Sequence, residues 1–243
     1  MTLLAILGIA IYEATTRSYT INYQLTHESD DYIAISSALA VIDEDISQIF
    51  NPIIGSEAPP QDNNGSIPLF WSLPVRPDGT RRSRFKGSVE KISFITNSNH
   101  RFEKDLTQSD FLKITWEIEK NKSNTYTLYR TTDWDAFNYE DSKQRKLQKS
   151  PVISNLTSGK FMFFKALDKT WTDTWDSEGA FINKQARFPD MISLKMELPD
   201  PTNNTKSRSW QTYFKPNENP NTDGQIGPVQ TKPMDLDAIP NPT

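Results

Sequence analysis

The sequence predicts an α+β fold in which a long N-terminal helix packs on an antiparallel β-sheet head. The first 50 residues contain no proline, and their apolar side chains recur mainly at three- and four-residue intervals, which is the period of a helix. Later segments alternate apolar and polar side chains and are separated by polar turns, which is typical of antiparallel strands. The 243 residues are enough to bury a genuine core.

The chain opens on an apolar run of about twelve residues. This run is too short to cross a bilayer, because a spanning helix needs about 20 apolar residues. It also lacks the features of a signal peptide, since no basic residue precedes it and no small-residue cleavage site follows it. A helix that is apolar on every face must be surrounded by protein or lipid. We therefore interpret residues 1–20 as the apolar half of a membrane or stem helix.

Residues 21–51 are predicted to continue this helix with only one apolar side. Asn51 precedes Pro52, and the residue before a proline disfavours helical geometry, so we expect the helix to end there. The whole helix would then have about 50 residues and a length of roughly 75 Å. Its apolar side contacts either neighbouring helices or the sheet of the same chain, and the sequence does not separate these uses. The candidate contact residues are Ile21, Leu25, Tyr32, Ile35, Leu39 and Ile42.

Residues 52–214 are predicted to form the head, with a loop-rich region at 53–87. The predicted strands are 88–96, with Ile92 and Phe94 on one face, then 111–119, 125–130, 160–167, 190–198 and 207–214. The second and third of these form a hairpin. A polar insertion at 133–149 and a tryptophan-rich turn at 170–177 interrupt the series. Residues 215–243 contain six prolines and are predicted to be a disordered tail.

Composition excludes several classes of protein. A net charge of −4 and a pI near 5.3 argue against a nucleic-acid binder, which usually carries a basic face. The chain has no cysteine, which rules out disulfides, thiolate zinc sites and cysteine nucleophiles. It has only nine glycines and no phosphate-binding loop. We therefore predict that the protein is not an enzyme and that it needs no cofactor.

The remaining candidates for chemistry are weak. We interpret His27 and His100 as surface histidines, since neither lies near a nucleophile or in a metal-ligand spacing. The acidic cluster at 43–45 is expected on the helix surface near its C-terminal end, where the helix dipole is unfavourable, and this suggests a basic partner. Two loop pairs, Asp133 with Asp135 and Asp173 with Asp176, lack the ligand spacing of a known calcium loop. Six tryptophans suggest sugar stacking, but those on strands are expected in the core.

Three stretches resemble the J-type minor pseudopilin of the type II secretion system (general secretion pathway protein J), a family with type IV pilin-like stems. The first is the helix, as IYEATTRSYTINYQL followed by ALAVIDEDISQIF. The second is the hairpin FLKITWEIEK…TYTLYRTTDWD. The third is KFMFFKALDKTWTDTWDSEGAFINKQARFPDMISLKMEL, a strand and a tryptophan-rich turn, then a proline just before an alternating strand. Together they cover about half of the chain.

This resemblance implies a pilin-like stem, an inner-membrane anchor, a periplasmic head and a place in the pseudopilus tip beside the I-type and K-type minor pseudopilins. The family begins with a basic leader and a Gly-Phe-Thr-Leu-type site for prepilin peptidase, and neither is found here. We expect both, with the rest of the apolar segment, upstream of Met1. The alternatives are a minor pilin of a type IV pilus and a membrane-tethered periplasmic module that binds glycans through its aromatic side chains.

Overall fold

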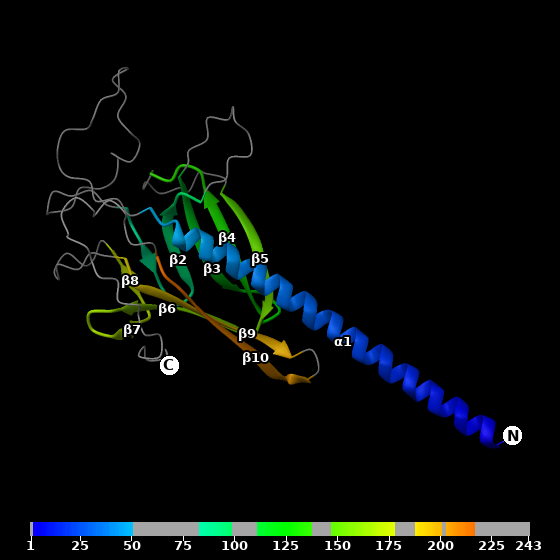
Figure 1. Cartoon of the computed structure of the whole chain (residues 1–243). Coiled ribbons are helices and arrows are strands. Elements are labelled where there is room, and N and C mark those ends of the chain that lie inside the picture. Colours follow the sequence, from blue (N-terminus) through cyan, green and yellow to red (C-terminus); the bar gives the residue numbers. More distant parts are fainter. Residues whose placement is uncertain are drawn as a thin grey trace, which may run out of the picture.

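The computed structural model describes residues 2–50, 83–98, 111–137, 147–177, 188–200 and 203–216. Helix α1 extends far beyond a head made of strands, and the N-terminus lies at its distant end (Figure 1). The elements, in chain order, are α1 (Thr2–Ser47), β1 (Lys86–Gly87), β2 (Lys91–Thr96), β3 (Leu112–Lys120), β4 (Tyr126–Asp133), β5 (Gln148–Leu156), β6 (Ser158–Lys165), β7 (Thr170–Thr172), β8 (Trp175–Asp176), β9 (Met191–Asp200) and β10 (Asn203–Phe214).

The strands form two antiparallel sheets. One has six strands in the order β5-β4-β3-β2-β1-β8, and the other has four in the order β10-β9-β6-β7. The C-terminal part of α1 lies across the six-stranded sheet, and the four-stranded sheet runs beside it (Figure 1). The predicted α+β class with antiparallel pairing in the head is confirmed.

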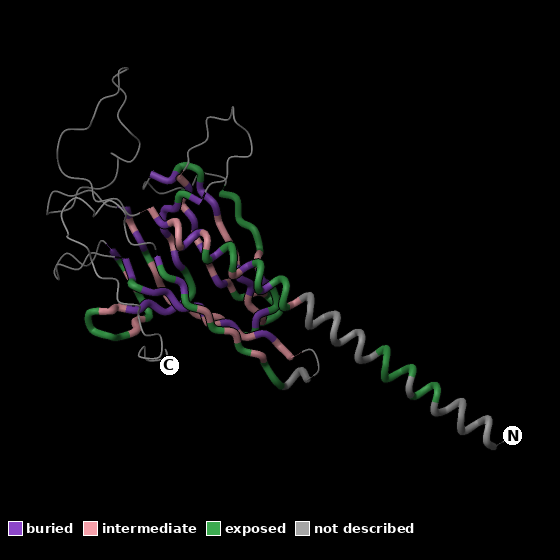
Figure 2. The backbone as a smooth tube through the Cα atoms, viewed as in Figure 1, coloured by how far each residue is buried: buried purple, intermediate pink, exposed green. Residues whose placement is uncertain are grey.

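One main core joins the helix and both sheets. Ile42 and Ile46 of α1, Trp116 of β3, and Phe161 and Leu194 of the four-stranded sheet belong to the same buried cluster. Buried segments are concentrated in the head, whereas the described side chains of the protruding part of α1 are exposed (Figure 2). A smaller cluster of Ile95, Ala136 and Phe137 lies apart from the main core, with Phe50 and Phe111 packed against it.

The alternating segments form the strands that their patterns predict. In β3 the side chains of Leu112, Ile114, Trp116 and Ile118 are buried, and in β9 those of Ile192, Leu194, Met196 and Leu198 are buried. The hairpin of β3 and β4 pairs Trp116 with Arg130. Ile92 and Phe94 are both buried in the main core, as expected of residues that share a face.

Three features differ from the sequence prediction. The sequence does not predict strand β5, because its apolar and polar residues do not alternate and Pro151 lies within it. The tryptophan-rich segment is not a simple turn, since Trp171 lies in β7 and Trp175 in β8, which belong to different sheets. Helix α1 ends at Ser47 and not at Asn51, because the following residues already pair with β2: Ile49 bridges Thr96, and Phe50 N–H donates to the Ile95 carbonyl (2.8 Å).

Gly87 in β1 allows the close approach of the two sheets. A Cβ atom at this position would lie only 2.2 Å from the ring of Phe163 in β6, which is fully buried. A backbone hydrogen bond also joins β6 to the turn between β1 and β2, since Phe161 N–H donates to the Val89 carbonyl (2.7 Å). The glycine therefore lets an aromatic ring of one sheet lie against the backbone of the other.

Several predictions fall outside the described residues. These are most of the loop-rich region 53–87, His100, the middle of the polar insertion at 138–146, and the tail from residue 217 onward. Pro216, which lies within the predicted tail, is buried. Within the described ranges, no helix has a segment long and apolar enough to span a bilayer.

Candidate functional site

Some residues on the predicted contact side of α1 are buried by the head, and others are not. Ile35 and Ile42 are buried, and Leu39 is partly buried against the main core. Tyr32, in contrast, is 66% exposed. Ile21 and Leu25 lie in the helix, but their side chains are outside the part that the structure describes.

Tyr32 therefore does not contact the head of its own chain, and its use against a neighbouring helix stays a prediction. The helical positions that the head buries are Ile35, Ala38, Ile42, Asp45 and Ile46. The buried face of α1 is centred slightly to one side of the predicted contact face. The small Ala38 is buried, whereas the larger Leu39, which the pattern predicts there, is only partly buried. A pattern drawn from large apolar residues alone does not detect such an alanine.

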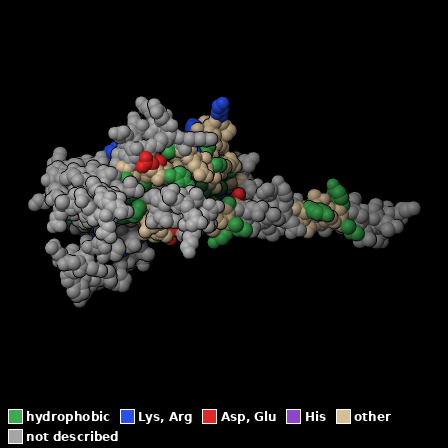
Figure 3. Space-filling view, turned by 90° about the horizontal axis from the view of Figure 1, so that it is seen from above, with side chains coloured by type: hydrophobic (Ala, Val, Ile, Leu, Met, Phe, Trp, Pro, Cys, Tyr) green, Lys and Arg blue, Asp and Glu red, His purple; other side chains and the backbone are tan. Residues whose placement is uncertain are grey.

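The part of α1 farther from the head has exposed apolar side chains. Ile11, Tyr12 and Tyr19 are all exposed, and hydrophobic atoms cover much of the described surface in this region (Figure 3). The only ion pair described here is the weak contact of Arg17 with Glu13, at 4.0 Å. Contiguous exposed apolar surface usually marks an interaction site. This segment is therefore a candidate surface for contact with other molecules.

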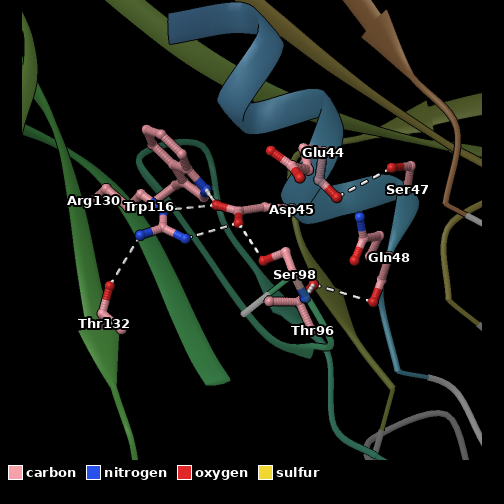
Figure 4. Close-up of polar contacts among 9 residues, drawn as sticks. All are labelled: Glu44, Asp45, Ser47, Gln48, Thr96, Ser98, Trp116, Arg130 and Thr132. Atoms are coloured by element: carbon pink, nitrogen blue, oxygen red, sulfur yellow. Dashed lines mark hydrogen bonds and ion pairs between the residues drawn. The ribbon is translucent and has the colours of Figure 1, made fainter. Parts of the chain in front are cut away.

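The end of α1 is joined to the six-stranded sheet by a buried carboxylate (Figure 4). Asp45 is 1% exposed. Its Oδ2 accepts hydrogen bonds from Trp116 Nε1 (3.0 Å) and Arg130 Nε (2.8 Å). Its Oδ1 accepts hydrogen bonds from Ser98 Oγ (2.8 Å) and Arg130 Nη2 (2.8 Å). The guanidinium therefore binds the carboxylate through two parallel bonds, which is the strongest geometry for this pair.

Arg130 is held in place by the same sheet that presents it. Its Nη1 donates to Thr132 Oγ1 (3.1 Å), two residues along β4. The hydrogen bond from Arg130 to Asp45 raises the pKa of the guanidinium against the opposing effect of burial, and the charges of Asp45 and Glu44 raise it further. Both charges are thus compensated within the chain.

The carbonyl group just after α1 also has partners beside the sheet. The Gln48 carbonyl accepts hydrogen bonds from Thr96 Oγ1 at the end of β2 (3.1 Å, Figure 4) and from Asn97 N–H, the next residue along the chain (3.0 Å). Carbonyls at the end of a helix have no partner inside the helix, and these contacts satisfy the one that follows its last residue. The end of the helix is therefore fixed to β2 as well as to β3 and β4.

These contacts correct the expectation that residues 43–45 form an acidic helix surface for a basic partner. Asp43 is exposed, but Asp45 is buried, and its basic partner is Arg130 of the same chain. One feature of the sequence indicates that the pair of Asp45 and Arg130 could form. Arg130 and Trp116 both lie at inward-facing strand positions, and a buried indole N–H usually requires an acceptor.

The geometry gives Asp45 a structural role. Its two oxygens already accept four hydrogen bonds, so the carboxylate is not free to take a proton from a substrate. Among the residues that the structure describes, no group of three or more His, Asp or Glu side chains has the arrangement of a metal site. Asp133 Oδ1 accepts a bond from Asp135 N–H (3.0 Å), and Asp176 lies 3.8 Å from Lys86 Nζ. The side chain of His27 and all of His100 lie outside the described part of the chain.

Comparison with known proteins gives a family match over most of the chain. The model of the family described as type II secretion system (T2SS), protein J, matches residues 15–206. Comparison with curated protein sequences gives no significant match. Among solved structures, the chain is similar to one in the crystal structure of the GspK-GspI-GspJ complex from the type 2 secretion system of enterotoxigenic Escherichia coli. The identity is 13% and the TM-score is 0.48, over 78% of this chain and 99% of that chain.

Proposed function

The chain belongs to the family of protein J of the type II secretion system, and from this membership we propose a structural role as a minor pseudopilin in the tip complex of the pseudopilus. The observation that carries the proposal is the division of α1. Its C-terminal part is buried in the head, and its described N-terminal part exposes large apolar side chains. A subunit that assembles through its helix needs both parts.

We propose that the partners are the I-type and K-type minor pseudopilins and that the outer part of α1 packs against their helices. Exposed apolar side chains at Ile11, Tyr12 and Tyr19 support such contacts. The proposed contact residues Ile21 and Leu25 lie between this segment and the head. Removing this apolar surface from water favours assembly.

We further propose that the N-terminal end of α1 is anchored in the inner membrane and that the head lies in the periplasm at the pseudopilus tip. The apolar composition of residues 1–12 supports this orientation. A reporter enzyme that is active only in the periplasm, fused after Pro216, should be active in cells. The same reporter would stay inactive if the head faced the cytoplasm.

The proposed role is not catalytic. The buried carboxylate Asp45 is fully occupied by Arg130, Trp116 and Ser98. A hydrolase or transferase activity of the purified chain that disappears on Asp133→Asn and Asp135→Asn would contradict this role. Membership of the type II secretion family favours this system over the alternative of a minor pilin in a type IV pilus.

The proposal is tested by co-purification of the full-length chain with the I-type and K-type pseudopilins of the same secretion system. Ile21→Asp and Leu25→Asp should weaken the association by at least about tenfold, because each would bury an unpaired carboxylate against a neighbouring helix. Thr16→Asp adds the same charge at an exposed position on the opposite side of the same helix and serves as the control. If all three variants bind as tightly as the parent, the helix is not the interface.

A further inference from the structure

A groove crosses the outer face of the six-stranded sheet, on the side away from α1. Ile92 and Trp116 point into the main core, so the residues that alternate with them along β2 and β3 point outward. Ser93 and Thr115 are such residues, and they lie opposite each other, with Thr131 of β4 opposite Thr115. Three short hydroxyl side chains therefore form one continuous row across three strands.

Longer side chains stand on both sides of this row. Lys91 lies two residues from Ser93 on β2, and Lys113 lies two residues from Thr115 on β3, so each flanking row is displaced by about 7 Å along the strands. Asp133 lies opposite Lys113 and continues that side onto β4. Short side chains between longer ones leave a hollow of about 580 Å³. The hydroxyl row is thus the floor of the groove.

One end of the groove lies at the edge of the sheet. Lys86 of β1 lies opposite Ser93, and the edge strand, β8, supplies Asp176 opposite Lys86 and Trp175 opposite Gly87. Gly87 also lies opposite the core-facing Ile92, so the side chain of Trp175 starts from the core face, packs partly on the main core and borders the groove only from the sheet edge. From β1 to β4 the floor spans three strand spacings, or about 14 Å. This length suits an extended ligand more than a single small molecule.

The charges along the groove are compensated. Lys91 Nζ lies 2.9 Å from Glu117 Oε1, and Lys86 Nζ lies 3.8 Å from Asp176 Oδ2. Burial raises the pKa of Glu117, but the hydrogen bond and charge of Lys91 and the charge of Lys149 outweigh it, so the pKa is lowered and the carboxylate stays ionised at neutral pH. The lining contains three lysines and two aspartates, and Glu117 beside it pairs with Lys91, so the groove has no strong single-sign field to attract a polyanion. The complementary ligand is neutral and has many hydrogen-bonding groups.

We propose that this groove binds a neutral oligosaccharide chain. Trp175 contacts the apolar face of a sugar ring at one end. Ser93 Oγ and Thr115 Oγ1 lie 3.0 Å apart in a hydrogen bond, and their remaining hydrogen-bonding capacity, together with the Thr131 hydroxyl, binds sugar hydroxyl groups. Lys91 and Asp133 at the sides supply a charged donor and a charged acceptor, which form stronger hydrogen bonds than neutral groups do. The site is separate from α1 and goes beyond the proposed assembly role, because it would attach the head to a polysaccharide.

The test is titration calorimetry of the full-length protein with two neutral probes, the hexamer of N-acetylglucosamine and maltohexaose. At least one should bind with a dissociation constant of about 1 mM or lower. Thr115→Tyr places a large ring on the floor and should weaken binding at least about tenfold. Glu119→Tyr adds the same ring to the same face of β3, outside the groove, and should bind as the parent does.

A second pair of variants tests the aromatic contact. Trp175→Ala should weaken binding at least about fivefold, whereas Trp134→Ala removes an exposed tryptophan that does not line the groove and should have no effect. Thermal melting establishes that each variant is folded. The proposal is overturned if neither probe binds, if the two tyrosine variants bind alike, or if polyphosphate binds more tightly than both sugars.

Discussion

The inner and outer parts of α1 have similar apolar side chains but different surroundings. In the inner part, Ile35, Ile42 and Ile46 are buried by the sheets of the same chain. In the outer part, Ile11, Tyr12 and Tyr19 are exposed. A helix of 46 residues is roughly 69 Å long, whereas strands usually span about 17–20 Å. A head of this kind covers only one end of such a helix, which leaves the other end available to partners.

The inner part differs from the outer part in its polar contacts as well. Asp45 and the Gln48 carbonyl just after α1 accept hydrogen bonds from β3, β4 and the end of β2 with the residues that follow it, so the direction in which the helix leaves the head is fixed by hydrogen bonds as well as by apolar packing. In the outer part, the described side-chain hydrogen bonds of Thr15 and Thr16 are made within the helix. Substitutions at four sites would distinguish how the inner and outer parts of α1 contribute to the stability of the head.

The largest effect is expected at Ile42, which is fully buried. Ile42→Asp removes core packing worth about 2–5 kcal/mol and places an unpaired carboxylate in the core. Since domains are stable by only about 5–15 kcal/mol, we expect the head to unfold. The measurement is thermal melting followed by circular dichroism.

Val41→Asp is the matched control, because Val41 is the neighbouring residue on the same helix and is 40% exposed. It should change the free energy of unfolding by less than about 1 kcal/mol. Equal destabilisation by the two variants would mean that Ile42 does not lie on the side of the helix that packs against the sheets.

The second effect concerns the pair of Asp45 and Arg130. Arg130→Leu leaves the carboxylate buried without its main partner and should cost about 3–5 kcal/mol, as measured by urea unfolding. Asp45→Asn in the same chain removes the uncompensated charge, so the double variant should be more stable than Arg130→Leu alone. If the double variant is the less stable of the two, the ion pair is not the dominant contact of Asp45.

Strands with one buried face could be predicted from the sequence, because apolar residues then recur at every second position. β3 alternates strictly, and β9 alternates from Leu194 onward after four buried residues, so spacing alone indicates the inward residues of both strands. Strand β5 gave no such signal, since most of its side chains are exposed and its place in the sheet depends on pairing with β4. An edge strand of this kind is specified by its neighbour and not by its own pattern.

The candidate site was only partly predictable. Of the residues predicted on the apolar side of α1, Ile35 and Ile42 are buried by the head, Tyr32 is exposed, and the buried Ala38 gives no signal in a pattern of large apolar residues. The pair of Asp45 and Arg130 was not found, because 85 residues separate its members and nothing local connects them. An acidic residue near a helix end is usually solvated, so its burial becomes evident only once β3 and β4 are placed beside it.

A smaller effect on the free energy of unfolding is expected at the ion pair that joins α1 to β10. Arg208 Nη2 of β10 lies 3.1 Å from Asp31 Oδ2, and both side chains are partly exposed. Exposed ion pairs are worth about 0–1 kcal/mol, so Asp31→Asn should lower the free energy of unfolding by a few tenths of a kcal/mol. The difference should decrease further at high salt, since salt screens exposed charges. A loss above about 2 kcal/mol would show that the buried region of the helix extends beyond this residue.

The smallest effect on stability is expected at Tyr32, one residue farther along the helix, which the head of its own chain leaves exposed. Its side chain is exposed, so Tyr32→Gln should change the free energy of unfolding by no more than about 0.5 kcal/mol. Ile35→Gln, one turn farther on at a buried position, should destabilise the head by more than about 2 kcal/mol, because it replaces core packing with a polar amide. Chemical denaturation of both variants gives the comparison directly. If Tyr32→Gln destabilises the isolated chain as much as Ile35→Gln, the head covers more of the helix than the structure shows. If it leaves the isolated chain unchanged but weakens association with the I-type or K-type partner, Tyr32 belongs to the outer part of the helix, and its apolar surface is used in assembly.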